Sequence, residues 1–273
     1  MIGIIGAIAG DAIGVPYEFY QGENIKTKEF DLIKIESRVS DDTAHTIAVA
    51  DWLMNTDRSP EALSNLILEY TRTYSGYGFG GMMFKKCIEE GKLEPYGSWG
   101  NGSAMRVSPV AWVTDNFEEC MELAEKSASV SHNHIEGIKG AQATAAAVWL
   151  NRKGYTKEFV KSYIEDEFGY NLSRTVDEIR QDYHFYVSCQ KSVPESIICW
   201  LESTSYEDCI RNTISLGGDA DTMACIAGGI CNANPETQIS DELVIELFGE
   251  YDRRLDNHMR DILNKFHETY EML

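Results

Sequence analysis

Two short acidic segments stand immediately before apolar stretches of helical spacing, and their residue types suit a hard cation. The first is Ser40-Asp41-Asp42-Thr43, and the second is Gly217-Gly218-Asp219-Ala220-Asp221-Thr222. One carboxylate or hydroxyl is enough to cap a helix, whose positive end favours negative charge. Two carboxylates at each turn instead crowd like charges, which a bound cation would relieve. Oxygen ligands without cysteine favour Mg²⁺, Mn²⁺ or Ca²⁺ over zinc.

Together the two segments carry enough oxygen ligands for a pair of ions. Four carboxylates and the neighbouring hydroxyls suffice for a two-metal site with the ions about 3.5–4 Å apart. The spacing alone leaves a second interpretation equally open, in which the acids are ordinary caps at unrelated helix ends. The two interpretations differ in whether the helix starts meet in space.

A third junction contains Glu18, which follows a stretch rich in small residues from Gly3 to Gly14. These small residues allow either close helix packing or a tight turn. Pro16 biases Val15 away from helical backbone. We therefore expect a break there, with Glu18 just beyond it at the mouth of a cleft. A lone glutamate is more often an ordinary surface residue, so this position by itself is weakly informative.

Two glycine-containing loops and a histidine pair could contact an anionic or planar ligand. Residues 99–106 (WGNGSAMR) can present backbone N–H groups to an anion, although an ordinary turn is the simpler interpretation. Residues 76–81 (GYGFGG) match GxGxxG by letter, but no βαβ unit surrounds them. We expect an aromatic loop there that could line a pocket for a planar group. His132 and His134 lack a third zinc ligand, so a hydrogen bond to substrate and no special role are both open.

The overall composition excludes several classes of partner. Among 273 residues, 24 Lys and Arg stand against 44 Asp and Glu, which gives a net charge of −20. This charge disfavours nucleic acids in general and anionic membrane surfaces. The seven cysteines form no CxxC pair, which indicates buried free thiols in a reducing compartment. The apolar N-terminus is short, lacks basic residues and is interrupted by Asp11, so we expect no signal peptide and a cytoplasmic protein.

Most of the chain shows apolar residues at helical spacing, and strand-like alternation is rare. Residues 30–39 could form a strand, but no neighbouring segment offers a partner. Pro194 suits the first turn of a helix that begins near Glu195. We predict an all-α protein, a single compact domain over residues 1–273 with roughly ten or more helices, and expect a monomer. The expected helices cover residues 43–54, 61–75, 117–130, 135–152, 157–168, 174–186, 195–203, 206–216, 221–231 and 241–269.

Five segments resemble the ADP-ribosylglycohydrolase family, which includes the dinitrogenase reductase-activating glycohydrolase. In the family's order they are GAIAGDAIGVPYEF (6–19), SDDTAHTIAVADWL (40–53), GNGSAMRVSPVAW (100–112), SVSHNHIEGIKGAQATAAAVWL (129–150) and SLGGDADTMACIAGGI (215–230). Each segment is weakly specific alone, but the five in order are specific and span most of the chain. The resemblance implies an all-α fold with a dinuclear magnesium site in a central cleft, where Mn²⁺ could replace Mg²⁺.

The resemblance also implies roles for particular residues. Glu18 occupies the place of the family's glutamate at the cleft and, with Asp41 and Asp221, forms the implied catalytic set. Gly102 and Ser103 match the loop that holds the diphosphate, and His132 matches the histidine that contacts the ADP-ribose. The implied metal ligands are Ser40, Asp41, Asp42, Asp219, Asp221 and Thr222, and the implied substrate contacts are Asn101, Gly102, Ser103 and His132.

The implied reaction is magnesium-dependent hydrolysis of the C1″ glycosidic bond of an ADP-ribosyl group, through an oxocarbenium-like state. It would release ADP-ribose from a modified protein, and the family's bacterial members favour an arginine N-linkage. The alternatives are serine-linked or other O-linked substrates and small ADP-ribose conjugates. A two-metal phosphohydrolase that cuts the diphosphate and a non-enzymatic reader or crystallin-like member are the remaining possibilities. The expected partner is an ADP-ribosylated protein or a small ADP-ribose conjugate, with neither nucleic acid nor membrane.

Overall fold

The computed structural model describes residues 3–18, 25–249 and 254–271, and the regular structure in these ranges is helical. Their only β pairing is an isolated antiparallel bridge between Gly100 and Ser188. The predicted all-α class is therefore confirmed. The α-helices are α1 (Ile5–Glu18), α2 (Asp41–Asn55), α3 (Pro60–Thr73), α4 (Gly81–Phe84), α5 (Gly102–Met105), α6 (Phe117–Ser129), α7 (Ile135–Arg152), α8 (Lys157–Phe168), α9 (Val176–Asp182), α10 (Cys189–Leu201), α11 (Tyr206–Ile214), α12 (Ala220–Cys231), α13 (Asp241–Phe248) and α14 (Asn257–Phe266). Short 3₁₀ or π segments are η1 (Lys85–Glu89), η2 (Ser108–Trp112) and η3 (His267–Glu271).

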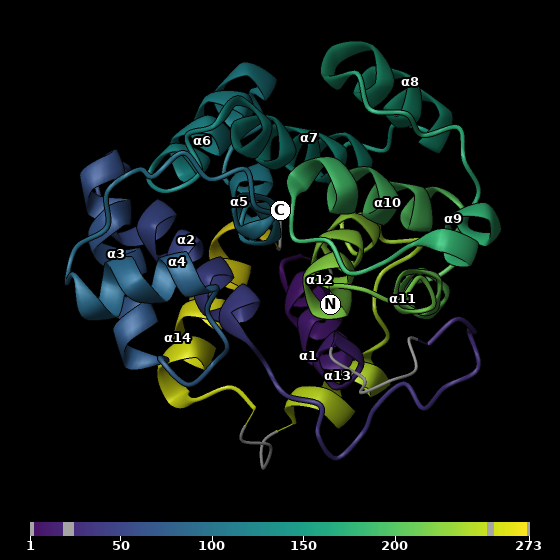
Figure 1. Ribbon diagram of the computed structural model, residues 1–273, viewed down its shortest axis with the longest axis horizontal. Helices are drawn as coiled ribbons and strands as arrows, with labels where there is room; N and C mark the ends of the chain where they lie inside the picture. The colour runs from purple at the N-terminus through teal and green to yellow at the C-terminus, as the bar shows by residue number, and fades with distance from the viewer. Residues whose placement is uncertain (1–2, 19–24, 250–253, 272–273) are drawn as a thin grey trace.

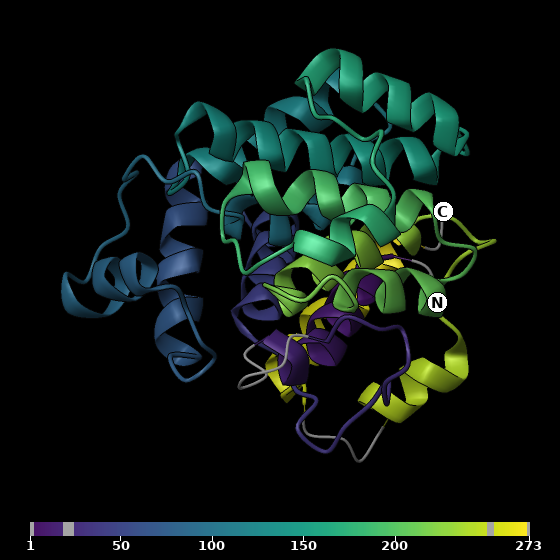
Figure 2. The same cartoon turned by 45° about the vertical axis from the view of Figure 1, so that its right-hand side comes forward.

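Helices α1 and α12 lie at the centre of the fold. Figures 1 and 2 show α1 in the interior beside α12, with α2, α3 and α14 on one side and α10 and α11 on the other. Helices α6, α7 and α8 cover the top of the view in Figure 1. A large hydrophobic core runs through these layers and includes the buried rings of Trp52 and Trp200. Polar groups on the facing surfaces of α1 and α12 are therefore shielded from bulk water.

Glycine residues bring α1 and α12 into very close contact. A Cβ atom at Gly10 would lie 2.1 Å from the carbonyl oxygen of Ala224. A Cβ atom at Gly14 would lie 2.5 Å from the Cα atom of Asp221. Any side chain at these positions would push the two helices apart, so only glycine permits this spacing. Close helix packing, rather than a tight turn, is thus the role of the small residues, and it places Asp11 opposite Asp221.

Many helix starts follow local capping chemistry that is readable in the sequence. The side chains of Ser59, Thr156 and Asp256 accept backbone N–H groups in the first turns of α3, α8 and α14. Thr175 and Glu178 form a reciprocal capping box at the start of α9. These interactions satisfy the backbone donors that an isolated helix start leaves without partners.

The two proline predictions were wrong. Helix α1 continues through Pro16 to Glu18 instead of breaking at Val15. Pro16 lies in the last turn, where it removes a single bond of the helical ladder, and the packing of α1 on α12 outweighs that loss. Helix α10 begins at Cys189, so Pro194 lies inside the helix rather than in its first turn.

Two expected helices and the possible strand also differ from the structure. The stretch 241–269 contains two α-helices, because the chain leaves helical conformation at Gly249 and Asp256 caps the start of α14. Helix α9 is shorter than the expected 174–186, since its last residue is Asp182. Residues 30–39 form no strand; they cross the surface without regular structure, as a segment without a pairing partner must.

All seven cysteines are buried free thiols, as predicted. Burial raises the pKa of Cys199 to about 12, so this thiol stays protonated and unreactive at neutral pH. None of the helices described combines the length and the apolar character that a membrane crossing requires.

Candidate active site

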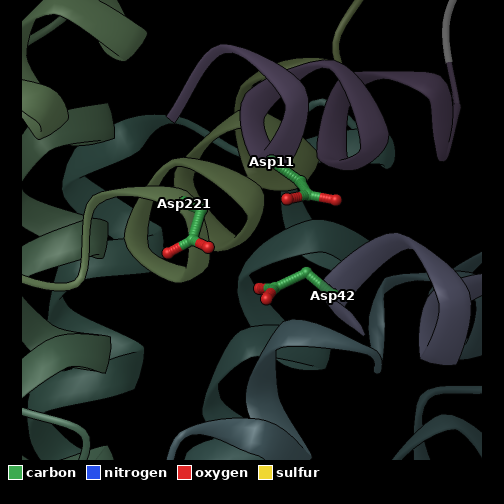
Figure 3. Close-up of side chains that lie close together, drawn as sticks. All are labelled: Asp11, Asp42 and Asp221. Atoms are coloured by element: carbon green, nitrogen blue, oxygen red, sulfur yellow. The ribbon is translucent and has the colours of Figure 1, made fainter. Parts of the chain in front are cut away.

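Carboxylates from three helices converge in the centre of the fold. Asp11 of α1, Asp42 of α2 and Asp221 of α12 point toward one another (Figure 3), and oxygens from the three lie within 4.8 Å of one another. A second cluster consists of Glu18, Asp219 and Asp221, whose carboxylate oxygens also lie within 4.8 Å of one another. The two acidic segments therefore meet in space, which excludes the interpretation of caps at unrelated helix ends.

The remaining predicted metal ligands lie in the same place. Asp41 and Thr222 line the same cavity as Glu18 and the other predicted acids. The Thr222 hydroxyl donates to Asp42 Oδ2 at 3.4 Å and so connects α12 to α2. Ser40 is buried, and its hydroxyl lies 3.2 Å from the same Asp42 oxygen. The structure thus brings all six residues together at two helix starts.

Asp11 holds the start of α2 in position. The Ser40 backbone N–H donates to Asp11 Oδ2 at 2.9 Å, and the Ser40 hydroxyl donates to Oδ1 at 2.7 Å. Thr43 donates to Oδ2 through its backbone N–H at 3.1 Å and through its hydroxyl. Asp11 is therefore a helix cap supplied by another helix. This role of Asp11 was not predicted, because its partners are 29 and 32 residues away along the chain, although an aspartate inside an apolar helix was an available signal.

Two glycines and an amide position the start of α12. Gly217 and Gly218 have φ angles of 67° and 110°, in the region that residues with side chains avoid. Beyond this turn, Asn101 Nδ2 donates to Asp219 Oδ2 at 2.7 Å. The Asn101 side chain, predicted as a substrate contact, is thus engaged in holding a carboxylate.

The clustered acids are shielded from water and repel one another. Burial, followed by the charge of Asp219, raises the pKa of Glu18 to about 7. Burial and the neighbouring carboxylates raise the pKa of Asp41 to about 8. The same two causes hold the pKa values of Asp42 and Asp221 well above their usual range. In the ranges the structure covers, no ion pair with Lys, Arg or His involves these acids, so their negative charge lacks a close cationic partner.

This arrangement fits divalent cations. Asp42 Oδ1 is buried and accepts no hydrogen bond from the described residues, which leaves a lone pair available to an ion. The donors are carboxylates and hydroxyls without sulfur or imidazole, the set that hard cations prefer. Asp221 belongs to both clusters of three carboxylates described above. Two ions could therefore be bound, one on each side of Asp221.

We expect the metal-free protein to lose stability as the pH rises from about 4 to about 8. Because the folded pKa values exceed the ordinary values of 3.8 for Asp and 4.5 for Glu, the folded cluster still holds protons that unfolded carboxylates have released. The free energy of unfolding must then fall with rising pH, and stabilisation by Mg²⁺ must grow. Melting temperatures across this range, in EDTA and in Mg²⁺, test the expectation. A melting temperature in EDTA that shows no such fall relative to Mg²⁺ would contradict it.

The acids line a cavity of about 410 Å³ that also has glycine, aromatic and basic walls. Gly78, Gly80 and Gly81 belong to its lining, so the aromatic loop reaches the cavity as the sequence suggested. Within that loop, Phe79 is buried against His45, with ring centroids 4.8 Å apart. A volume of this size accommodates part of a nucleotide-sized ligand.

The structure distinguishes among the predicted substrate contacts. Asn101, Gly102 and His132 line the cavity. The Ser103 hydroxyl is buried instead and donates to the carbonyl oxygen of Gly137 at 2.8 Å, so its backbone alone remains for a ligand. His134 caps α7 by accepting the backbone N–H of Glu136 at 3.1 Å. Of the two histidines, His132 is therefore the one placed to contact a substrate.

Two buried basic residues in the cavity wall were not predicted. His45 lies one turn after the acids on α2, where the apolar pattern concealed it, and Arg106 follows α5. His45 Nε2 lies 2.9 Å from the Thr71 hydroxyl, and burial holds the pKa of His45 well below its usual range. Arg106 is fully buried. His45 and Arg106 come from segments far apart in the sequence, so their meeting at one cavity could be recognised only from the tertiary structure.

The fold and the cavity define an all-α protein with an acidic cluster that could hold metal ions. A family model for ADP-ribosylglycohydrolase matches residues 2–268. The chain therefore belongs to the ADP-ribosylglycohydrolase family, and it is a hydrolase of the glycosidase type.

Individual relatives agree with the family model. ADP-ribosylhydrolase ARH3 of Danio rerio is 24% identical over an alignment of 301 positions that covers 85% of this chain and 81% of the relative. ADP-ribosylhydrolase ARH3 of Homo sapiens is 24% identical over an alignment of 304 positions that covers 84% of this chain and 83% of the relative. Among solved structures, an ADP-ribosylglycohydrolase-related protein complex matches 97% of this chain and 95% of its own with a TM-score of 0.70. Its identity of 18% makes this last likeness one of fold alone.

Proposed function

We propose that this protein hydrolyses the glycosidic bond of ADP-ribosyl groups and releases ADP-ribose. The observation that carries the proposal is the convergence of carboxylates from α1, α2 and α12 on one cavity, in a chain of this family. The ARH3 relatives are ADP-ribosylhydrolases, which supports the same reaction.

We propose two Mg²⁺ ions as the cofactor, with Mn²⁺ as a substitute. When bound, such ions supply positive charge that orients sugar hydroxyls and polarises water. The unpartnered oxygen of Asp42 and the raised pKa values around it support this assignment. The residues that would hold the ions are Ser40, Asp41, Asp42, Asp219, Asp221 and Thr222.

Glu18 is the proposed proton carrier. It is half-buried in the last turn of α1 and lines the cavity, so a water molecule or leaving group can reach it. In the metal-free site the pKa of this carboxyl group is about 7, so the group can exchange a proton with water near neutral pH. Asp41 is the second candidate, since it too is half-buried in the cavity wall. The carboxylates around them favour the positive charge that develops on the sugar during cleavage.

Substrate binding is proposed for the loop around Gly102 and for His132. The Gly102 backbone and the His132 ring line the cavity and can meet the diphosphate without a charged side chain. The side chains of Asn101 and Ser103 already have partners. Asn101 would therefore support binding by holding Asp219, and Ser103 would do so through its backbone.

Product analysis with and without EDTA tests the proposed reaction. We expect an ADP-ribosylated peptide to yield free ADP-ribose by mass spectrometry, with activity lost in EDTA and restored by added Mg²⁺. Release of AMP would instead show cleavage of the diphosphate. Binding of ADP-ribose without turnover of any substrate would show a non-enzymatic reader. Either of these two results would refute the proposed function.

The acceptor and its setting are further parts of the proposal. We expect an arginine N-linkage on a modified protein, and we expect a monomer in the cytoplasm. A panel of arginine-linked, serine-linked and O-acetyl-linked ADP-ribose substrates tests the linkage. An arginine-linked peptide should show the highest kcat/KM, and a preference for either other substrate would overturn the assignment.

A further inference from the structure

We propose that Arg106 and Ser131 are positioning residues that keep His132 neutral with its proton on Nε2. This N–H would then be the hydrogen-bond donor that the cavity offers to an oxygen of the ADP-ribosyl group. The inference about the donor rests on the proposed function. The inference about the imidazole rests on the hydrogen bonds alone.

The His132 ring has one engaged nitrogen and one free nitrogen. Nδ1 lies 2.7 Å from the Ser131 hydroxyl oxygen. Nε2 has no hydrogen-bond partner in the part of the chain that the structure covers, and it lies against the glycines of the cavity loop. A Cβ atom on Gly102 would be 3.1 Å from Nε2, and one on Gly100 would be 3.5 Å away. A ligand oxygen at this loop would therefore meet Nε2 rather than Nδ1.

Proton accounting at Ser131 determines which nitrogen is protonated. The Arg106 guanidinium can only donate, and its Nη2 donates to the Ser131 oxygen at 2.9 Å. Ser131 is fully buried, and the Nδ1 of His132 is the acceptor available for its single O–H. If Nδ1 carried the proton, the Ser131 hydrogen would be buried without an acceptor, which is costly. The O–H therefore donates to Nδ1, and the neutral ring carries its proton on Nε2.

Arg106 also keeps the ring uncharged. Its side chain is fully buried and no carboxylate pairs with it within the described ranges. Nη2 is shared between Ser131 and the carbonyl oxygen of Ser127, while Nε and Nη1 have no partner. Burial, and after it this uncompensated positive charge, holds the pKa of His132 well below its usual range. The same positive charge would favour an anionic group bound at Nε2. This attraction gives the buried, unpaired Arg106 a role in ligand binding.

The ring tautomer can be measured directly by ¹⁵N NMR of histidine-labelled protein. We expect the wild type to show His132 as a single Nε2–H tautomer at neutral pH. Ser131→Ala should give a mixture of tautomers and weaken ADP-ribose binding in proportion to the loss of the Nε2–H form, about twofold for an equal mixture. Ser131→Thr, which keeps the hydroxyl, should restore both properties.

Ser127→Ala is the matched control. It removes a buried hydroxyl of equal size one helical turn away that has no hydrogen-bond partner, while the Ser127 carbonyl still accepts from Arg106. It should change neither the tautomer nor the affinity. A wild-type spectrum with the proton on Nδ1, or a Ser131→Ala protein with unchanged tautomer and affinity, would overturn the inference. The expected spectra in a protein that cleaves no ADP-ribosyl substrate would refute the proposed function and leave the positioning roles intact.

Discussion

Replacing Asp221 with asparagine should abolish metal binding and, with it, hydrolysis. Asp221 is the carboxylate that the two acidic groups share, so the substitution removes a ligand from both proposed ion positions. Loss of a residue that merely supports a ligand weakens metal affinity by about 10–100-fold. We expect loss of this shared ligand to exceed that range. Calorimetric titration with Mg²⁺ and kcat/KM for an ADP-ribosylated peptide measure the two effects.

The same substitution should stabilise the metal-free protein. Asp221 is buried, and its burial followed by the charges of Asp42 and Asp219 raises its pKa well above the usual range. An amide of the same shape removes one charge from this cluster, so the melting temperature in EDTA should rise. Each kcal/mol gained corresponds to about 2–4 °C in a domain of this size class. Loss of activity together with a gain in stability separates a functional effect from misfolding.

Asp261→Asn provides the control for this experiment, because Asp261 is exposed on α14. It should leave Mg²⁺ affinity, activity and melting temperature unchanged. Unaltered Mg²⁺ affinity in Asp221→Asn would show that the ions, if bound, lie elsewhere.

Gly10→Ala should cause the largest loss of stability among single methyl additions to the α1–α12 contact. The new Cβ atom would lie 2.1 Å from a backbone oxygen of Ala224, and neither helix can yield by rotating a side chain. Overpacking of this kind costs about 1–3 kcal/mol or more, which lowers the melting temperature by roughly 2–12 °C. Because Asp11 follows directly on α1, Mg²⁺ affinity should also fall. Thermal unfolding and Mg²⁺ titration measure both effects.

Two other glycines calibrate this result. A Cβ atom at Gly76 would meet nothing within 4 Å, so Gly76→Ala should be neutral. At Gly229, on the same α1–α12 contact, the nearest atom is the Ala7 side chain at 3.2 Å, so Gly229→Ala should be milder than Gly10→Ala. Equal stability of all three variants would contradict the view that backbone contact between α1 and α12 sets the geometry of the acids.

Local chemistry was predictable from the sequence. The Ser40 side chain accepts the backbone N–H of Asp42 within one turn, so the start of α2 could be identified without any distant contact. The all-α class and the buried thiols likewise followed from the spacing of apolar residues over short stretches. Such features depend on neighbours along the chain, which the sequence displays directly.

Contacts between distant segments were not predictable in the same way. Asn101, which was expected to contact substrate, lines the cavity and also donates to Asp219, which is 118 residues away. Pro16 was expected to end a helix that the packing of α1 on α12 sustains. The hydroxyl of Ser103 faces Gly137 of another helix instead of the cavity. In each case a partner that is remote in sequence outweighs the local preference.

The sequence by itself determined which helix starts carry carboxylates, because a cap and its helix are neighbours in the chain. Only the tertiary structure decided that Asp42 and Asp221 meet, and that Asp11 holds the start of α2 beside them. The reason is that the separation of these groups depends on how closely α1 can approach α12. Gly10 and Gly14 of α1 set how closely the two helices approach, because they pack against the backbone of α12. The order of residues does not reveal that α12 lies there.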